Sequence, residues 1–560
     1  MYAQTTTILR GVIKDTKKQA IEGVNIQFDS FGTTSDKNGN YSLRIPLNKS
    51  ITITFSHIAH YSFTKDITAR SKNGIRFSPT LTPKTETLKE IVVKNNKKNA
   101  AGVTKIDVLK AKNIIGPNAG VENVLMTLPG VNNNNELSTQ YNVRGGNFDE
   151  NLVYVNGIEI YRPFLIRSGQ QEGLSFINSN MVKNINFSAG GFQAKYGDKL
   201  SSVLDITYRE AKERAVTIDA SILGGSITLE GHFLNKKLSA ITGIRYRDNS
   251  LFVNSKQVET NFKPRFTDVQ SFLSYKATDL LTLNFLGNFS LNNYNYTPIS
   301  RRTRFGTVNA PIELTVFYEG QEMNNYLTLF GALSANYKVN DAVEVIATAS
   351  SYNTQEEEYF DIAAAYNLGE VDANIGSEDF GEVAFSEGIG SQLNHARNDL
   401  DALISNFQLK GTYENGTLEI SAGLKYQHED IKDRIREWEI IDSLGFSVRP
   451  PLTAGNNQPY VSFEGPILPY QNIRADNNVQ INRVSGFVQL NEKRLWKAHE
   501  IWYSLGVRAQ NWNVTGNGVT SKNQVTLSPR AQFAIKPDWS QDMLFRISGG
   551  WYSQPPSYRE

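Results

Sequence analysis

Apolar and polar residues alternate along most of the chain after residue 214. Segment 279–291 is typical, because Leu281, Leu283 and Phe285 are separated there by polar residues. A period of two residues is that of a β-strand with one apolar and one polar face. The alternation predicts thirteen strands, at residues 214–224, 226–234, 237–247, 268–277, 279–291, 325–339, 342–355, 403–414, 417–430, 480–494, 499–512, 524–536 and 541–552.

The connections between these predicted strands are alternately short and long. Asn415-Gly416 is a short connection, whereas long ones are expected at about residues 292–324, 356–402 and 431–479. A soluble β-sandwich also alternates apolar and polar residues. Short turns at one end and long loops at the other are instead typical of an outer-membrane barrel, whose short turns are periplasmic. The pattern therefore favours a transmembrane barrel.

Thirteen strands do not complete such a barrel. Bacterial single-chain barrels have even strand numbers, and plugged outer-membrane transporters have 22 strands. An open sheet edge would leave backbone groups unsatisfied in lipid, which is costly. We therefore expect these strands to be part of a 22-stranded antiparallel barrel, in a natural chain that continues beyond Glu560. Residues 1–4 are similar to the end of a signal peptide, so we also expect it to begin upstream.

Residues 8–83 predict a small β-sandwich of short strands separated by polar turns. His57 and His60 lie three residues apart. On a strand, residues with that spacing point to opposite faces, so we expect no shared metal ion there. None of the six histidines lies in a zinc-peptidase motif.

A polar, lysine-rich segment follows the sandwich. It contains the short β-branched run Glu90, Ile91, Val92 and Val93. Such a run within a polar segment is suited to adding a strand to a partner's sheet edge. The alternative is that it forms the last strand of the sandwich.

Residues 140–210 contain several strand signals separated by glycine. Asn156-Gly157 lies between apolar residues and predicts a type I′ hairpin turn, which requires two residues with positive φ. Four motifs follow in order: Leu128-Pro129-Gly130-Val131, Val143-Arg144-Gly145-Gly146, Tyr154-Val155-Asn156-Gly157-Ile158, and Gly190-Gly191-Phe192 with Tyr196-Gly197 and Val203-Leu204-Asp205-Ile206. Together they resemble the plug domain of TonB-dependent outer-membrane receptors.

The N-terminal segments Gly11–Asp15, Ile21–Val24 and Thr34–Tyr41 resemble a carboxypeptidase-regulatory-like domain, which often precedes the plug in receptors of Bacteroidetes type. The resemblance implies a mostly β chain. Its domains would be the sandwich at residues 5–84, a linker at 85–104, the plug at 105–210, and the first part of the barrel at 211–560.

Three groups of site residues follow from the resemblance. Residues Glu90–Val93 would be the TonB box, which contacts a TonB-type energy-coupling protein. The loop after the plug hairpin would contact ligand through Tyr161, Arg162, Phe164 and Arg167, or would pack against the barrel wall. Val143-Arg144-Gly145-Gly146 would be structural, with Arg144 buried beside a carboxylate.

Composition excludes several other functions. The 58 basic and 56 acidic residues give a net charge of +2, which gives no support for nucleic-acid binding. The chain has no cysteine, so thiol catalysis and cysteine-ligated metals are excluded. No nucleophile–base pair or metal-ligand motif is present. We expect neither an enzyme nor a bound cofactor.

The resemblance implies a transporter of the Gram-negative outer membrane, with a periplasmic N-terminal domain. It would take up ferric siderophore, cobalamin or an oligomeric nutrient, and would contact outer-membrane lipid. A surface lipoprotein is a further partner the family allows. The alternative is a non-transporting surface receptor or adhesin on the same scaffold.

Overall fold

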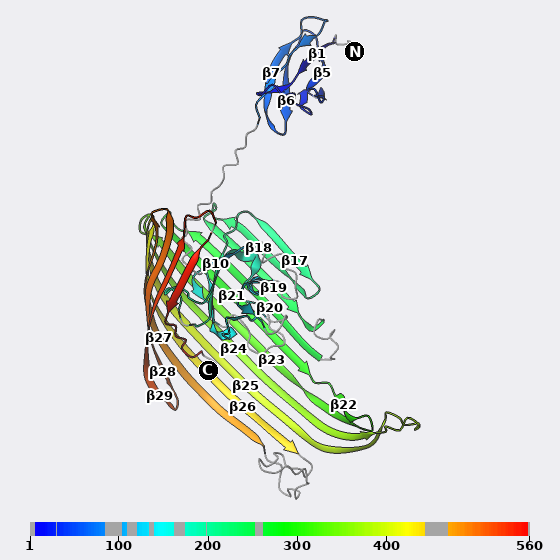
Figure 1. The fold of residues 1–560 in the computed structure, drawn as a ribbon, viewed down its shortest axis with the longest axis vertical. Coiled ribbons are helices and arrows are strands. Elements are labelled where there is room, and N and C mark those ends of the chain that lie inside the picture. Colours follow the sequence, from blue (N-terminus) through cyan, green and yellow to red (C-terminus); the bar gives the residue numbers. More distant parts are fainter. Residues whose placement is uncertain are drawn as a thin grey trace. The chain divides into compact units, whose positions relative to one another are not determined.

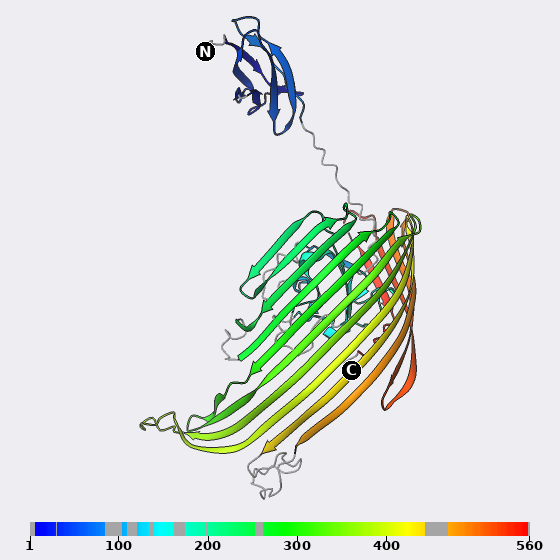
Figure 2. The same cartoon turned by 180° about the vertical axis from the view of Figure 1, so that it is seen from behind.

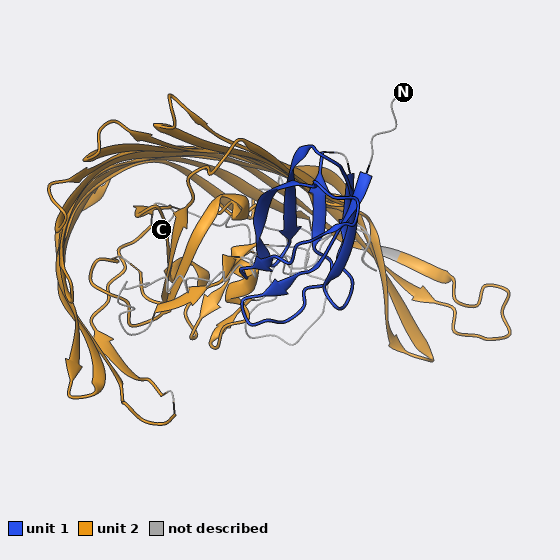
Figure 3. Cartoon of the chain, turned by 90° about the horizontal axis from the view of Figure 1, so that it is seen from above, with its two compact units in different colours: residues 1–97 blue, residues 98–560 orange. Residues whose placement is uncertain are grey.

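The chain is almost entirely β-structure. The computed structural model describes residues 6–29, 31–83, 103–108, 120–133, 139–161, 174–197, 199–251, 261–442, 469–541 and 543–557. Two compact units are present, residues 1–97 and residues 98–560 (Figure 3).

The first unit is a β-sandwich, as predicted. One sheet has the strand order β4-β3-β6-β7 and the other β5-β1-β8, and β2 pairs with β9. Alternate residues of β6, such as Ile51, Ile53 and Phe55, are buried in the core that the two sheets share. The strands are β1 Thr6–Val12, β2 Lys14–Asp15, β3 Asn25–Phe28, β4 Phe31–Thr34, β5 Asn40–Pro46, β6 Ser50–His57, β7 His60–Thr68, β8 Ile75–Arg76 and β9 Thr80–Leu81.

His57 and His60 lie side by side, and the expectation that they point to opposite faces is wrong. Strand β6 ends at His57 and β7 begins at His60, so the two residues are paired across a hairpin. Their Nδ1 atoms are 2.9 Å apart. Burial, together with the neighbouring His57, lowers the pKa of His60. Within the described residues, no group of three or more His, Cys, Asp or Glu side chains is placed to hold a metal ion.

The second unit begins with a small α+β domain, the plug domain, whose sheet has the order β10-β15-β16-β13-β14. Asn156 and Gly157 have φ values of 53° and 75° and connect β13 to β14, which confirms the predicted hairpin turn. No helix in the described residues is long and apolar enough to cross a membrane. The elements are β10 Val103–Ile106, α2 Val121–Leu125, β11 Val131–Asn132, β12 Asn142–Val143, β13 Asn151–Val155, β14 Ile158–Glu159, β15 Val182–Ala189 and β16 Ser202–Tyr208, with 3-10 helices η1 Phe148–Glu150 and η2 Ser179–Met181.

The rest of the described chain forms one large antiparallel sheet (Figures 1 and 2). All thirteen predicted strands are present, each hydrogen-bonded to the next in chain order, and β22 adds a hairpin to β23. The strands are β17 Ala215–Ser221, β18 Gly224–Phe233, β19 Leu238–Asp248, β20 Asn261–Lys276, β21 Leu281–Thr297, β22 Arg301–Thr307, β23 Ala310–Lys338, β24 Val343–Val371, β25 Val383–Asn415, β26 Leu418–Asp442, β27 Gln471–Trp496, β28 His499–Gly516, β29 Val519–Lys536 and β30 Phe545–Gly550.

Strands β23 to β27 are much longer than predicted, with 25 to 33 residues each. At about 3.4 Å per residue, the 33 residues of β25 extend about 110 Å, whereas about 10 residues cross a bilayer. The predicted long loops at 292–324 and 356–402 are therefore wrong, because most of their residues lie in strands. Residues 356–371 pair with β23 and β25, and residues 383–402 pair with β24, so the strands continue through these segments.

The two faces of the sheet have the reverse of a soluble protein's polarity. Large apolar side chains on the outer face are exposed: Leu283, Leu329, Leu333, Phe407 and Leu424 are 42% to 64% exposed. Polar side chains on the inner face are buried, including Gln270, Gln489 and Gln510. This arrangement is the one expected for strands with lipid on one side and a polar lumen on the other.

Candidate functional site: the plug and the inner face of the sheet

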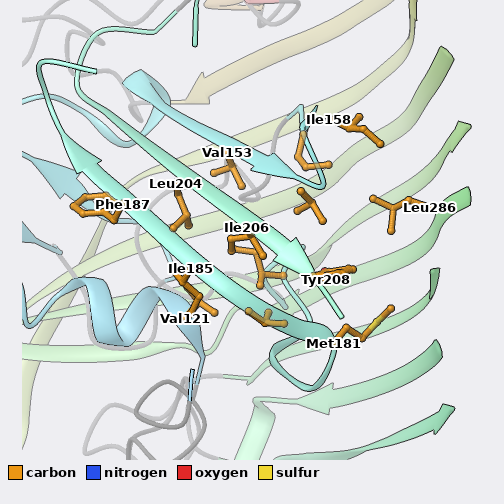
Figure 4. Packing of buried hydrophobic residues seen from close by; sticks show 14 of the residues in the cluster. Val121, Val153, Ile158, Met181, Ile185, Phe187, Leu204, Ile206, Tyr208 and Leu286 are labelled. Atoms are coloured by element: carbon orange, nitrogen blue, oxygen red, sulfur yellow. The ribbon is translucent and has the colours of Figure 1, made fainter. Parts of the chain in front are cut away.

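The plug packs on the inner face of the large sheet through a shared apolar core. Val121 from α2, Ile185 from β15 and Ile206 from β16 lie in the same buried cluster as Phe272 and Leu286 from the sheet. Figure 4 shows Leu286 beside the plug strands. Leu286 is 1% exposed and belongs to the inner face, so the plug replaces water there.

The segment before η2 is held by a basic residue of β19. The guanidinium of Arg245 donates to the backbone oxygens of Ser175, at 2.7 Å, and Ile177, at 2.9 Å. Asp268 on β20 forms an ion pair with Arg245. Ser175 Oγ donates to the carboxylate of Glu122 on α2. Burial raises the pKa of Glu122 above its usual value.

The hairpin β13–β14 is held by β25 and β26. Lys425 Nζ lies 2.5 Å from Glu159 Oε2 and 2.7 Å from the hydroxyl of Tyr161. That hydroxyl is also 2.9 Å from Asn406 Oδ1 and from Gln427 Oε1. Burial, and next the carboxylate of Glu159, raise the pKa of Tyr161 well above its usual range. The hydroxyl of Tyr161 thus contacts the wall, as in the packing alternative.

The segment after β15 is held by β27 and β29. Arg530 donates to the backbone oxygens of Gln193, at 3.0 Å, and Tyr196, at 2.5 Å. Gln489 Oε1 accepts from the backbone N–H of Lys195 at 3.1 Å. Three basic residues of the wall, on β19, β26 and β29, therefore each bind a different segment of the plug.

These three wall residues were absent from the sequence prediction. The alternation places Arg245, Lys425 and Arg530 on the polar face of their strands, which is the signal that was available. The alternation does not indicate which segment contacts a residue of the polar face. The plug segments that these three residues bind are between 68 and 337 residues away in sequence.

The motif Val143-Arg144-Gly145-Gly146 forms a turn of the plug, and Arg144 is exposed rather than buried. Arg144 and Gly145 have φ values of 51° and 86°, and Gly146 N–H donates to Val143 O at 3.0 Å. This left-handed turn places the arginine side chain at the surface, which corrects the expected burial. A Cβ on Gly146 would lie 1.8 Å from Ser201 Oγ, so close packing requires glycine there.

Most of the other predicted site residues cannot be placed. Arg162, Phe164 and Arg167 lie outside the described residues, as does the segment Glu90–Val93. Their roles, and the four domain boundaries given above, remain predictions.

Two family models match the chain. Residues 9–93 match the CarboxypepD_reg-like domain, so this match includes Glu90–Val93. Residues 98–202 match the TonB-dependent receptor plug domain. No curated protein matches the chain.

Several solved structures are similar to the chain at low sequence identity. The ferric preacinetobactin receptor BauA of Acinetobacter baumannii is 12% identical with a TM-score of 0.46; the match covers 78% of this chain and 61% of BauA. The unliganded ferric citrate transporter FecA is 12% identical with a TM-score of 0.45, covering 78% and 62%. FpvA of P. aeruginosa, bound to a heterologous pyoverdine, is 10% identical with a TM-score of 0.47, covering 81% and 60%. The chain thus spans about three-fifths of the length of each.

Proposed function

We propose that this chain, which carries a CarboxypepD_reg-like domain and the plug domain of a TonB-dependent receptor, is an outer-membrane transporter for a scarce ligand. The observation that carries the proposal is the plug itself. It packs on the polar inner face of a sheet whose outer face is apolar. A plugged pore conducts nothing until the plug moves, so transport needs a source of work.

The plug's polar contacts support a movable plug. Arg245 and Arg530 bind backbone oxygens, and Lys425 binds one carboxylate. Water can replace each of these partners when the plug moves, and exchanging a hydrogen bond of a charged group with water changes the free energy by about 1.5 to 3 kcal/mol. Separation also exposes the apolar core that the plug shares with the sheet, and the burial energy lost there is part of the work that transport requires.

The work would come through Glu90–Val93, the TonB box of this proposal. These residues precede the plug-domain match, which begins at residue 98, so tension on them reaches the plug directly. A β-branched run binds a partner mainly through backbone hydrogen bonds to a sheet edge. Proline at its centre removes one N–H and breaks that pairing.

The ligand would be recognised by two parts of the chain. One is the set of connections at the ends of the long strands farthest from the short turns, and the other is the plug loop that begins at Tyr161. Arg162, Phe164 and Arg167 are the proposed plug contacts. Ferric siderophore, cobalamin or an oligomeric nutrient are the candidate ligands, and a surface lipoprotein is a candidate partner. The exposed apolar residues of the outer face are the proposed contact with outer-membrane lipid.

The test is complementation of a deletion strain of the source bacterium. The strain is grown with iron, cobalamin or an oligomeric nutrient as the limiting supply, and carries wild type, Val92→Pro or the control Asn96→Pro. We expect wild type and Asn96→Pro to restore growth in one of these media and Val92→Pro to fail. Equal outer-membrane levels of the three proteins, measured by immunoblot, exclude a folding defect.

Restored growth with Val92→Pro would refute energy coupling through this segment. Failure of wild type to restore growth in any of these media would instead favour the second candidate, a surface receptor or adhesin that binds without transport. Pull-down by the periplasmic domain of a TonB-type protein provides an independent readout. Val92→Pro should lose that interaction, and Asn96→Pro should keep it.

A further inference from the structure

Four long strands, β24 to β27, continue the wall well beyond the plug. Tyr352 on β24 and Ile404 on β25 pack in the plug's apolar core, so the residues in phase with them form the inner face. Strand pairing carries this face to β26 and β27, where Ile431 and Ile481 are buried together.

The two faces of this extension carry different charges. The outer face has both signs and carries three ion pairs: Arg434 with Asp399, Arg436 with Asp476, and Arg397 with Asp361. The inner face is acidic beyond the buried ion pair of Arg483 with Glu429; the Arg483 guanidinium also donates to the backbone oxygen of Pro556 at 2.7 Å. In residues 355–363, 392–402, 430–441 and 472–481, its charged residues are Glu356, Glu358, Asp433, Glu437 and Glu439.

The inner carboxylates are oriented by neutral donors. Asn398 Nδ2 donates to Glu437 Oε1 at 2.5 Å, and Asn477 Nδ2 donates to Asp433 Oδ2 at 3.0 Å. The hydroxyl of Tyr326 donates to Glu358 Oε1 at 2.8 Å. Hydrogen bonds from amides and hydroxyls fix the position of a carboxylate and leave its charge in place.

A cavity of about 580 Å³ lies on this inner face. Its floor is aliphatic, because Leu400, Ile431, Val479 and Val514 pack together there. Glu358, Asp433 and Glu437 also line it. Cavities of 300 to 1,000 Å³ with apolar walls and a few fixed polar groups are typical ligand sites.

We propose that this cavity binds a short peptide that carries lysine or arginine beside aliphatic residues. The inference rests on the proposed function, since ligand enters from this side only if the chain is a receptor. The aliphatic floor takes the apolar side chains, and the carboxylates pair with the ammonium or guanidinium groups. A recess with fixed charge of one sign and low-dielectric walls concentrates ligands of opposite charge and slows those of like charge.

The test measures peptide binding to the full chain in detergent by fluorescence anisotropy at low ionic strength. The probes are fluorescein-labelled Lys-Leu-Leu-Lys amide and Glu-Leu-Leu-Glu amide, which differ only in the sign of their charge. We expect the cationic peptide to bind at least tenfold more tightly, and more weakly as salt is added.

Two double variants locate the site. Asp433→Asn with Glu437→Gln removes two charges from the inner face of β26, and Asp476→Asn with Glu357→Gln removes two from the outer face of β27 and β24. The inner variant should weaken binding of the cationic peptide at least tenfold, and the outer variant less than twofold. Equal effects of the two variants, or equal binding of the two peptides, would overturn the proposal.

This result is independent of the complementation test. Peptide binding that depends on Asp433 and Glu437 would stand even if Val92→Pro restored growth, in which case only energy coupling through Glu90–Val93 is refuted. Loss of growth with Val92→Pro, together with no preference for the cationic peptide, would refute only the ligand class.

Discussion

The contact of Lys425 with the plug hairpin gives the sharpest test of how the plug is held. Its Nζ lies 2.5 Å from Glu159 Oε2, and the two side chains are only 14% and 12% exposed. Lys425→Met keeps most of the aliphatic length and removes the charge. Glu159 then remains buried without this cation, and the hydroxyl of Tyr161 loses the donor at 2.7 Å.

Removing one partner of a buried ion pair costs about 3 kcal/mol, because the remaining charge is desolvated without compensation. We expect this cost to appear as easier local opening of β13–β14. Hydrogen exchange of the amides of Val153 to Ile158 should then be on the order of 100-fold faster in Lys425→Met than in wild type. Exchange of the strand amides in the N-terminal β-sandwich should be the same in both proteins and provides the internal reference.

Two further variants separate the ion pair from general disruption. Adding Glu159→Gln to Lys425→Met removes the orphaned charge and should restore most of the protection. Lys432→Met, in an exposed position of the same strand, should change nothing. Exchange within threefold of wild type in Lys425→Met would refute the view that this pair holds the hairpin.

Three other predictions concern packing, pH and the outer face. Gly146→Ala should lower the free energy of plug unfolding by about 2 kcal/mol in urea titrations, because its Cβ would meet Ser201 Oγ at 1.8 Å; Gly331→Ala, with open space around it, should not. Burial raises the folded-state pKa of Glu122, so its contribution to stability is full below the unfolded pKa near 4.5 and is lost as pH rises through the folded pKa. Glu122→Gln should therefore remove this fall in stability, and identical pH profiles of variant and wild type would contradict the assignment. Leu424→Arg, on the exposed apolar face, should destabilise the folded protein in lipid by about 2 to 4 kcal/mol, as measured by folding titrations into vesicles. Gln480→Arg, on the same face of β27 but beyond the apolar residues, should cost little, and equal costs would argue against lipid contact at Leu424.

Local patterns in the chain were sufficient to predict several elements. The period of two located thirteen of the fourteen strands of the main sheet, all but β22, because a strand with unlike faces must alternate. Asn156-Gly157 predicted its hairpin, because few other residue pairs adopt two positive φ values. The strand ends were less predictable. Residues 356–402 are polar enough for a loop, yet 356–371 and 383–402 remain in strands because neighbouring strands pair with them.

The sequence by itself determined which residues share a face, which turns close hairpins, and which charges alternate with aliphatic residues along β24 to β27. These are properties of neighbours in the chain, governed by local sterics and the strand period. Only the tertiary structure decided that His57 meets His60 across a turn, that Arg144 is exposed, and that Lys425 meets Glu159, 266 residues away. Only the tertiary structure also decided that the inner face beyond the plug is acidic. The negative charges gather on one face only when the four strands pair in this register. Contacts between distant segments depend on the docking of the plug against the wall, and alternation along one strand carries no information about what docks on it.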